Sequence, residues 1–401
     1  MAVNKYTLIG VDGGATKVSG WIITVLKEKQ SFSLSAHGIE RTYSSLNGHL
    51  NNFTPVEISE QLRQRERGTI SISDEESAQG ENFIRAAGQV IKDLFKLGEN
   101  KPVLIGIGMP GLKTDDHRGI NAIANGPRMP DYCSILENYL KHYGVELLAP
   151  LFHLGSDADY CGLGEFYAGE GSFRNTYNAY YLGGGTGAAD ALLLKGQLIA
   201  FDNIRSWMAK TWEMKNDLGI SFERYASASG LQSIYAGHSN KSLELLKKSN
   251  IHSPQIASLA LKGDDAAIKS YQEAAVYLAQ LIFERISTLY CGSLGILKFV
   301  NSNRTPLDPV HEFRGERFEK IVIGQRLGEL MASPGGYQVL TAPFLDALSQ
   351  ILRNTTGIPQ SMARIYLNDD VFDKTILIFS KLRQAPALGA GIDAHLNYFN
   401  R

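Results

Sequence analysis

Near the start of the chain lies the stretch Leu8-Ile9-Gly10-Val11-Asp12-Gly13-Gly14-Ala15-Thr16-Lys17-Val18. An apolar run precedes its two adjacent glycines and a β-rich run, 18–26, follows them, which predicts a strand, a tight turn and a second strand. The glycine N–H groups can converge on an anion, and Thr16 and Lys17 add a hydroxyl and a positive charge. Asp12 would repel a bare phosphate, so it suits such a site only with a divalent cation in between. The alternative is an ordinary hairpin with a Gly-Gly turn.

The length and composition narrow the class of protein. A chain of 401 residues exceeds what one compact core usually holds, so we expect two domains. Its 40 basic and 41 acidic residues nearly cancel, which gives no reason to expect nucleic acid or a membrane surface as a partner. The three cysteines are far apart and form neither a disulfide framework nor a zinc spacing. No apolar run has the length of a membrane span and no export signal is visible, so we expect a cytoplasmic protein.

A second stretch repeats the opening pattern. Residues 178–182 resemble a strand, the turn Gly183-Gly184-Gly185-Thr186-Gly187 follows, and 188–194 resemble another strand. Two hairpins of this kind, one in each half of the chain, indicate a nucleotide held between two domains.

Asp157 lies between these hairpins, just after the short predicted strand 151–154 and at the start of a predicted helix. Open α/β sheets place their ligands at the carboxyl ends of strands, and a carboxylate there can accept a proton from a substrate hydroxyl during phosphoryl transfer. The alternative is that Asp157 only caps the helix, a role for which Ser156 is equally suited.

Strands and helices alternate along the rest of the chain. A buried-type strand runs from Pro102 into the turn Pro110-Gly111. Residues 37–77 are polar and aperiodic, with a charge-dense run at 61–67, and we expect an insertion over a cleft or a mobile surface loop, with capture of phosphate by the arginines as a further alternative. We expect helices over 79–97, 132–143, 264–289 and 385–398, and strands over 5–11, 318–323, 362–367 and 374–379.

Taken together, these motifs resemble the ROK family of sugar kinases, within the actin, sugar kinase and Hsp70 superfamily. The opening stretch looks like the first phosphate motif of that superfamily, and Gly183–Gly187 with the turn 195–196 resembles the second. Five further stretches are similar to family motifs: 106–111 to "GIGxPG", 156–165 to "NDANAAALGE", 222–227 to "LExYASG", 321–324 to "IVLGG" and 388–391 to "LGAA".

The resemblance implies a fold and an activity. The fold would be α/β, with two related domains of mixed sheets flanked by helices, in a ribonuclease H-like (actin-like ATPase) arrangement around an interdomain cleft. The first domain would cover 1–155, with the final helix 385–401 packing back on it, and the second 156–384. The activity would be ATP-dependent phosphorylation of a hydroxyl of a hexose or an N-acylated amino sugar, with Mg²⁺, and we expect a homodimer.

The resemblance also implies roles for single residues. Asp157 would be the general base, and Asp12 would hold Mg²⁺ directly or through water. The nucleotide would be bound by Gly13, Gly14, Thr16, Lys17, Gly185, Thr186, Gly187 and, near the adenosine, Gly324. The sugar would be bound by Gly111, Asn125, Ser156 and Glu223.

The sequence departs from the family pattern at 206–213, where a "GEIGH" motif and then a cysteine-rich zinc loop are usual. We therefore expect no structural zinc. Glu213 is interpreted either as a substitute sugar ligand or as an exposed helix carboxylate. Trp207 and Trp212 either stack on the sugar or pack in the core.

Asp190 is a further departure, because it stands where more glycines are expected and would bring a carboxylate near the phosphates. This residue and the altered sugar pocket favour a second hypothesis, a ROK-like protein that binds a sugar or nucleotide without catalysis. The intact Asp12 and Asp157 favour catalysis. A transcription repressor of the same family would need a DNA-binding domain ahead of the first strand, which begins by Tyr6.

Overall fold

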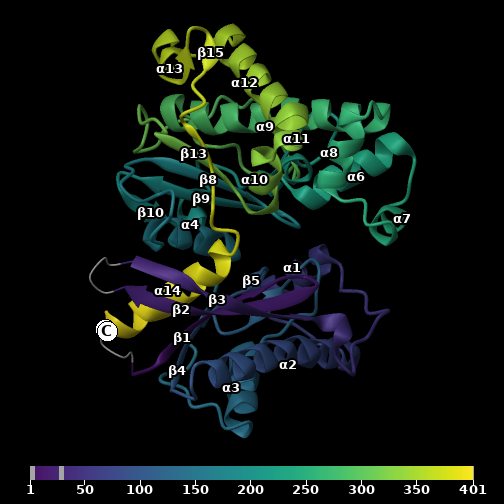
Figure 1. The fold of residues 1–401 in the computed structure, drawn as a ribbon, viewed down its shortest axis with the longest axis vertical. Coiled ribbons are helices and arrows are strands. Elements are labelled where there is room, and N and C mark those ends of the chain that lie inside the picture. The colour runs from purple at the N-terminus through teal and green to yellow at the C-terminus, as the bar shows by residue number, and fades with distance from the viewer. Residues whose placement is uncertain (1–4, 27–30, 401) are drawn as a thin grey trace. The chain divides into compact units, whose positions relative to one another are not determined.

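The computed structural model describes residues 5–26 and 31–400, so residues 1–4, 27–30 and 401 of the expected domains lie outside the description. The chain divides into two compact units, Met1–Gly169 with Gln384–Arg401, and Glu170–Arg383 (Figure 1). The boundary expected at 155/156 differs from this division by one helix, α4 (Asp157–Tyr167). This helix packs so closely on the final helix, α14 (Ala385–Phe399), that a Cβ added to Gly389 would lie 1.9 Å from the carbonyl oxygen of Tyr160.

The first unit is built on a five-stranded mixed sheet in the order β3-β2-β1-β4-β7. β1, β2 and β3 are antiparallel neighbours, whereas β4 lies parallel to β1 and β7 lies parallel to β4. The bounds are β1 Thr7–Gly13, β2 Lys17–Leu26, β3 Ser31–Thr42, β4 Val103–Gly108 and β7 Leu154–Gly155. A small ribbon pairs β5 (Leu112–Lys113) with β6 (Ile120–Ala122).

Helices cover both faces of this sheet (Figure 1). Helix α14 approaches one face so closely that a Cβ on Gly10 or Gly106 would lie within 2 Å of a carbonyl oxygen of the helix, which explains both glycines. On the other face, α2 (Asp74–Leu97) packs on Gly20, and α3 (Tyr132–His142) joins the same core. Ser73 begins α2 by accepting the N–H of Glu76 at 3.1 Å.

The second unit repeats this topology. Its five-stranded sheet has the order β10-β9-β8-β13-β16, with β8, β9 and β10 antiparallel and β13 and β16 parallel to β8. The bounds are β8 Ala179–Gly184, β9 Ala188–Leu194, β10 Gln197–Ile199, β13 Lys320–Gly324 and β16 Leu377–Phe379. The expectation of two related domains, each with a mixed sheet and flanking helices, is confirmed.

A helical layer packs on the second sheet around the long helix α9 (Asp265–Cys291), whose N-cap Asp264 accepts the N–H of Ala267. The other helices are α5 Phe222–Tyr225, α6 Ala228–Ser239, α7 Leu243–Lys248, α8 Ser253–Leu261, α10 Gln325–Ala332, α11 Pro334–Gly336, α12 Ala342–Asn354 and α13 Gln360–Tyr366. Short ribbons pair β11 (Met214–Lys215) with β12 (Lys298–Phe299) and β14 (Leu367–Asn368) with β15 (Val371–Phe372). Single helical turns lie at Tyr43–Ser45, Phe201–Ile204, Thr211–Glu213 and Tyr337–Thr341.

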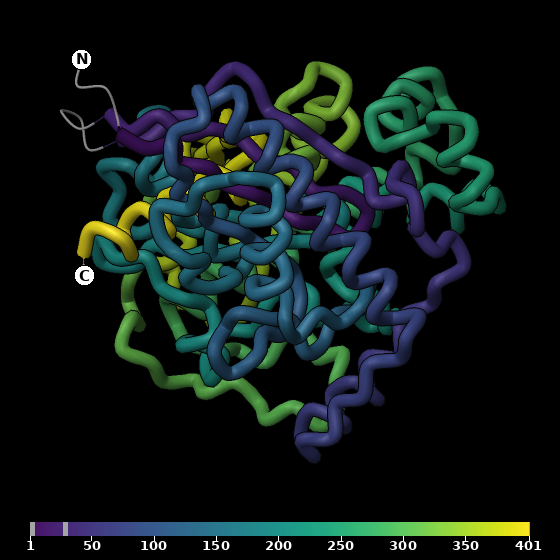
Figure 2. The backbone as a smooth tube through the Cα atoms, turned by 90° about the horizontal axis from the view of Figure 1, so that it is seen from below, coloured from purple at the N-terminus to yellow at the C-terminus, as the bar shows by residue number. Residues whose placement is uncertain are grey.

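Two segments differ from expectation. Residues 362–367, expected as a strand, belong mainly to helix α13, because the buried Met362 and Tyr366 are four residues apart and share a helical face. Residues 37–77 are not a structureless loop: β3 extends to Thr42 and helix α1 (Ile58–Glu66) follows. Figure 2 traces this segment, in indigo, from β3 to the start of α2. None of the helices within the described part of the chain is both long and apolar enough to cross a bilayer.

Candidate active site

Two carboxylates meet at one edge of the first sheet. Asp12, near the end of β1, is in register with Gly108 at the end of β4, and Gly108 is in register with Gly155 at the end of β7. Asp157 follows Gly155 by two residues and begins α4. Because the carboxyl ends of parallel strands share one edge, Asp12 and Asp157 are brought together there.

The ionisation of Asp12 reflects this neighbour. Burial, and then the negative charge of Asp157, raise the pKa of Asp12 from 3.8 to about 7, against the opposing charge of Lys17. The Lys17 ammonium is drawn partly away, because its Nζ lies 2.5 Å from Oε2 of Glu40 on β3. The edge therefore concentrates negative charge that a cation would relieve.

Ser156 takes the capping role that the sequence left open between two residues. Its Oγ accepts the N–H of Asp159 at 3.4 Å, which makes Ser156 the N-cap of α4. The Asp157 carboxylate accepts the adjacent N–H of Ala158, at 3.0 Å, and does not serve as the N-cap. The cap therefore gives no reason for an aspartate at position 157.

The orientation of α4 depends on Tyr160, which the sequence analysis did not single out. Its ring covers Gly155 so closely that a Cβ there would lie 2.0 Å from Cζ. Its hydroxyl donates to Oδ2 of Asp393 on α14 at 2.9 Å, and His153 Nε2 lies 2.7 Å from the same oxygen. The final helix thus fixes the helix that begins with Asp157.

The first glycine turn is closed by Gly14 N–H donating to the carbonyl of Lys17 at 2.9 Å. Tyr43 holds it from outside, because its hydroxyl donates to the carbonyl of Gly14 at 3.1 Å and its N–H donates to the carbonyl of Thr16 at 3.1 Å. Burial raises the pKa of Tyr43 well above its usual value, so the hydroxyl stays a donor. Gly13 faces Met109, whose Sδ would lie 1.9 Å from an added Cβ.

The expected sugar residues of this unit lie on the connection after β4. Gly111 has φ +93°, and an added Cβ would lie 2.5 Å from the carbonyl oxygen of Ala122, so both the backbone and the space require glycine. Asn125 is exposed in the turn after β6. That turn is held by the buried Gln61 of α1, whose side chain accepts the N–H of Ile123 at 2.8 Å and donates to its carbonyl at 3.0 Å.

The second glycine turn has the same closure, with Gly185 N–H donating to the carbonyl of Gly187 at 2.9 Å. Glu223, from α5, lies directly against it: its Oε1 accepts the N–H of Ala188 at 3.1 Å. The first turn of α6 is tied to the same loop through Ser229 N–H and the carbonyl of Gly185, at 3.3 Å. A cavity of about 380 Å³ opens here, and among its lining residues are Thr186, Ser221, Glu223, Ser229 and Gly230.

Gly324 lies at the end of β13, in register with Gly183. An added Cβ would lie 2.3 Å from the Tyr181 hydroxyl, so the strand end requires a glycine. Gly324 is also the N-cap of α10 and supplies no side-chain cap.

Asp190 does not point its charge at the second turn. It is buried, and its carboxylate accepts from the Tyr180 hydroxyl at 2.6 Å, from the Thr211 N–H at 2.8 Å and from Arg285 Nη2 at 3.2 Å. The expectation of a carboxylate near the phosphates is wrong, because Arg285 neutralises this one inside the core.

The region that replaces the usual zinc loop is packed. Glu213 is buried, with its carboxylate 2.5 Å from Arg205 Nη2 and accepting the N–H of Lys210 at 2.8 Å, so the expectation of an exposed helix carboxylate is wrong. Trp207 packs in the core and stacks on His311, with ring centroids 4.0 Å apart. Trp212 is 48% exposed and does not pack there.

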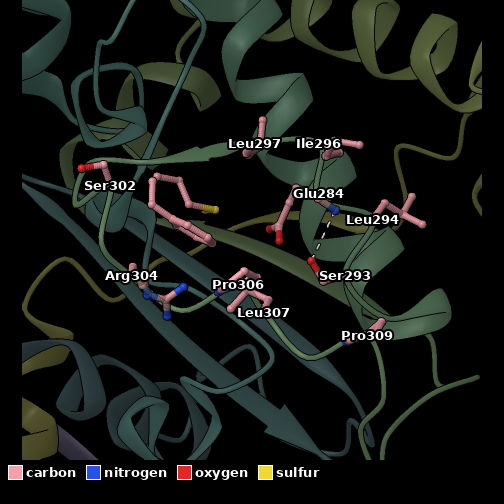
Figure 3. A pocket seen from close by; sticks show the side chains of 13 residues that line it. Glu284, Ser293, Leu294, Ile296, Leu297, Ser302, Arg304, Pro306, Leu307 and Pro309 are labelled. Atoms are coloured by element: carbon pink, nitrogen blue, oxygen red, sulfur yellow. Dashed lines mark hydrogen bonds between the residues drawn. The ribbon is translucent and has the colours of Figure 1, made fainter.

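A larger cavity, of about 540 Å³, lies elsewhere in the second unit (Figure 3). Apolar side chains such as Leu294, Leu297 and Phe299 line it together with Glu284 and Arg304. None of its lining residues belongs to either glycine turn, and it holds none of the expected site residues.

Within residues 5–26 and 31–400, no group of three or more His, Cys, Asp or Glu side chains is arranged to hold a metal ion. Mg²⁺ needs fewer protein ligands, because it usually binds one or two carboxylates and completes its shell with phosphate and water. The Asp12 carboxylate, whose pKa the charge of Asp157 helps to raise, fits such an ion. The absence of structural zinc stays a prediction, which elemental analysis of the purified protein tests.

No protein-family profile matches this sequence, and no curated protein is similar to it in sequence. Solved structures are similar in fold. A ROK family glucokinase from Streptomyces griseus, in complex with glucose and AMPPNP, has a TM-score of 0.57 at 15% identity and covers 97% of this chain and 99% of its own. A ROK hexokinase from Thermus thermophilus has a TM-score of 0.54 at 16% identity, over 98% and 100%.

A ROK family transcriptional regulator, homologous to the E. coli MLC protein, has a TM-score of 0.52 at 13% identity, over 98% of this chain and 79% of its own. At such identities the likeness establishes the fold alone. The chain has the two-domain, actin-like fold of the ROK sugar kinases.

Proposed function

We propose that this protein transfers the γ-phosphate of ATP to a hydroxyl of a hexose or an N-acylated amino sugar. One observation carries the proposal: Asp12 and Asp157 lie at the same carboxyl edge of the first sheet, and the charge of Asp157 contributes to the raised pKa of Asp12. A protein that only binds its ligands has no need of this costly pair. The fold shared with ROK glucokinase and hexokinase supports the same activity.

In this proposal Asp157 accepts the proton of the sugar hydroxyl as the phosphoryl group is transferred. The Asp157 carboxylate is suited to this because helix α4 has its own cap in Ser156. Asp12 holds Mg²⁺, directly or through water. The ion, when bound, neutralises charge on the donor phosphates.

The remaining residues bind and orient. The turn residues Gly13, Gly14, Thr16 and Lys17 in one unit, and Gly185, Thr186 and Gly187 in the other, contact one nucleotide, with Gly324 near its adenosine. Gly111, Asn125, Ser156 and Glu223 contact the sugar. By aligning the sugar hydroxyl with the γ-phosphate, these residues contribute most of the rate enhancement, because phosphoryl transfer requires little covalent chemistry from the protein.

The competing proposal is a protein that binds a sugar or nucleotide without catalysis. Asp190 and the altered sugar pocket favour it, and the buried ion pair of Asp190 with Arg285 removes the first of these two supports. The fold shared with a transcriptional regulator keeps the competing proposal open to the same test.

The test is ADP release from Mg·ATP over a panel of hexoses and N-acylated amino sugars, followed by mass spectrometry of the sugar product. The proposal requires one sugar to raise the rate of ADP release and to gain one phosphoryl group. Sugars that bind, as judged by thermal shift, without being phosphorylated would favour the non-catalytic protein.

A further inference from the structure

We infer that Arg326, which none of the sequence motifs includes, is a ligand of the donor nucleotide's phosphates. The inference rests on the proposed function only in the identity of the ligand, a nucleoside di- or triphosphate at the second glycine turn. Its geometry lies wholly within the second unit.

The side chain of Arg326 reaches from helix α10 to the turn between β8 and β9. Its Nη2 donates to Oγ1 of Thr186 at 3.1 Å and to Oγ of Ser229, in the first turn of α6, at 3.4 Å. Thr186 and Ser229 both line the 380 Å³ cavity. One guanidinium thus joins α10 to the β8–β9 turn and to α6 through two residues of the cavity lining, and one of these, Thr186, belongs to the turn expected to hold phosphate.

Within residues 5–26 and 31–400, Arg326 forms no ion pair, whereas the nearby Arg383 lies 3.4 Å from Glu329 Oε1. Arginine has five N–H donors in a planar fork that matches the oxygens of a phosphate. Its two hydrogen bonds to the hydroxyls of Thr186 and Ser229 use only Nη2, so most of the fork is available to an anion.

The backbone beneath Arg326 favours the same ligand. Helix α10 begins at Gly324 without a side-chain cap, so the positive end of its dipole is left for an anion. Gln325 has φ +57°, a left-handed conformation that is uncommon outside glycine and that clusters at ligand sites. Burial, and then the positive charge of Arg383, lower the pKa of Arg326, against the opposing charge of Glu329.

The experiment measures the Kd of Mg·ADP and of adenosine by calorimetry, without sugar, for the wild type and three variants. Arg326→Gln removes the positive charge, and Arg326→Lys keeps the charge but lacks the planar fork of N–H donors. The control is Arg353→Gln, because Arg353 is an exposed arginine in the last turn of α12. We expect Arg326→Gln to raise the Kd of ADP by about tenfold or more. Arg326→Lys should fall in between, adenosine binding should stay unchanged, and the control should match the wild type.

The inference is overturned if ADP affinity is unchanged in Arg326→Gln, if ADP and adenosine lose affinity equally, or if the wild type binds no ADP. Failure of the proposed function gives a different result. If ADP binding depends on Arg326 but the protein phosphorylates no sugar, the proposed kinase activity is contradicted and the role of Arg326 as a phosphate ligand is supported. If the protein phosphorylates a sugar and Arg326→Gln does not change its KM for ATP, the kinase activity is supported and the role of Arg326 is contradicted.

Discussion

Replacing Asp157 by asparagine keeps the shape of the side chain and removes its ability to take a proton. If Asp157 is the base, kcat should fall by about 10²–10⁴-fold. The KM for the sugar should change much less, because the amide still forms a hydrogen bond with a hydroxyl. Steady-state kinetics with the best sugar of the panel measure both values.

The matched control is Asp159→Asn, two residues along α4, whose backbone N–H bonds to the cap Ser156. This variant should keep kcat near that of the wild type. A folded Asp157→Asn protein with near-normal kcat would remove Asp157 from the mechanism and make Asp159 the next carboxylate to test.

Asp12 links function to stability through its pKa. The folded pKa of about 7 exceeds the ordinary value of 3.8, so the folded state holds this proton more tightly than the unfolded state. The contribution of Asp12 to stability therefore decreases as pH rises from about 4 to 7 and stays unfavourable above that range. At pH 8, Asp12→Asn should increase the free energy of unfolding of the ligand-free protein by ~1 kcal/mol or more and so raise its Tm. The same substitution should abolish Mg²⁺-dependent turnover.

Thermal denaturation of both proteins at pH 5 and pH 8, without nucleotide or metal, tests this linkage. The advantage of Asp12→Asn should shrink at pH 5, where the wild-type carboxyl is protonated in the fold. A lower Tm for Asp12→Asn at pH 8 would contradict the raised pKa.

Single residues were predictable where chemistry and turn geometry coincide in one stretch, as at Asp12 and at Gly185–Gly187. Tyr43 was not, because it reaches the first turn from the polar segment after β3, and no local pattern marks such a contact. Arg326 was missed for the same reason. It meets Thr186 and Ser229, which come from two other elements far away in the sequence.

At the scale of elements, α1 and the start of α2 are held by a buried ion pair. Arg128 donates to both carboxylate oxygens of Glu76, with Nη2 to Oε2 at 2.6 Å, and to Gln64 of α1 at 2.7 Å. Arg128 and Glu76 are almost fully buried. Arg128 also belongs to the loop that follows Asn125, so this pair and the Gln61 contacts fix α1 against an expected sugar residue.

Removing Arg128 leaves Glu76 as a buried charge without its partner. Arg128→Ala should therefore lower the free energy of unfolding by about 3–5 kcal/mol. Arg63→Ala is the control, because the pair of Arg63 with Glu60 lies at the surface, and this substitution should cost less than about 1 kcal/mol. Urea denaturation of the three proteins measures the difference, and equal losses for the two variants would refute this account of the segment.

Helices with long apolar periodicity were predictable from the sequence, as α9 and α14 illustrate. The order in residues 37–77 was not, because its stabilising contacts are long-range and polar: Gln61 bonds to Ile123, and Glu76 to Arg128. The pattern of hydrophobic residues along the sequence does not predict such polar pairs. The prediction of a strand at residues 362–367 was wrong for another reason, because a short apolar run does not distinguish a strand from one or two helical turns.

At the scale of the whole molecule, the two sheets share one topology although their sequences differ. The repeated glycine hairpin revealed this, because β1–β2 and β8–β9 occupy equivalent places in the two sheets. Glycines at close contacts, such as Gly106 against α14, preserve the packing while the other residues change. Such constraints are few, which is how the fold can match a glucokinase at 15% identity.

The proposed function makes a demand on the whole molecule. The turn at Gly14 and the turn at Gly185 belong to different units, and both must contact one nucleotide while Asp157 contacts the sugar. Substrate binding should therefore draw the units together and exclude water from the reacting groups.

Small-angle scattering should give a smaller radius of gyration with sugar and Mg·ATP than without ligands. The Asp157→Asn variant is the protein to use, because its slow turnover should leave the complete complex intact for longer. If calorimetry shows both ligands bound and the radius of gyration does not change, closure is not part of the mechanism.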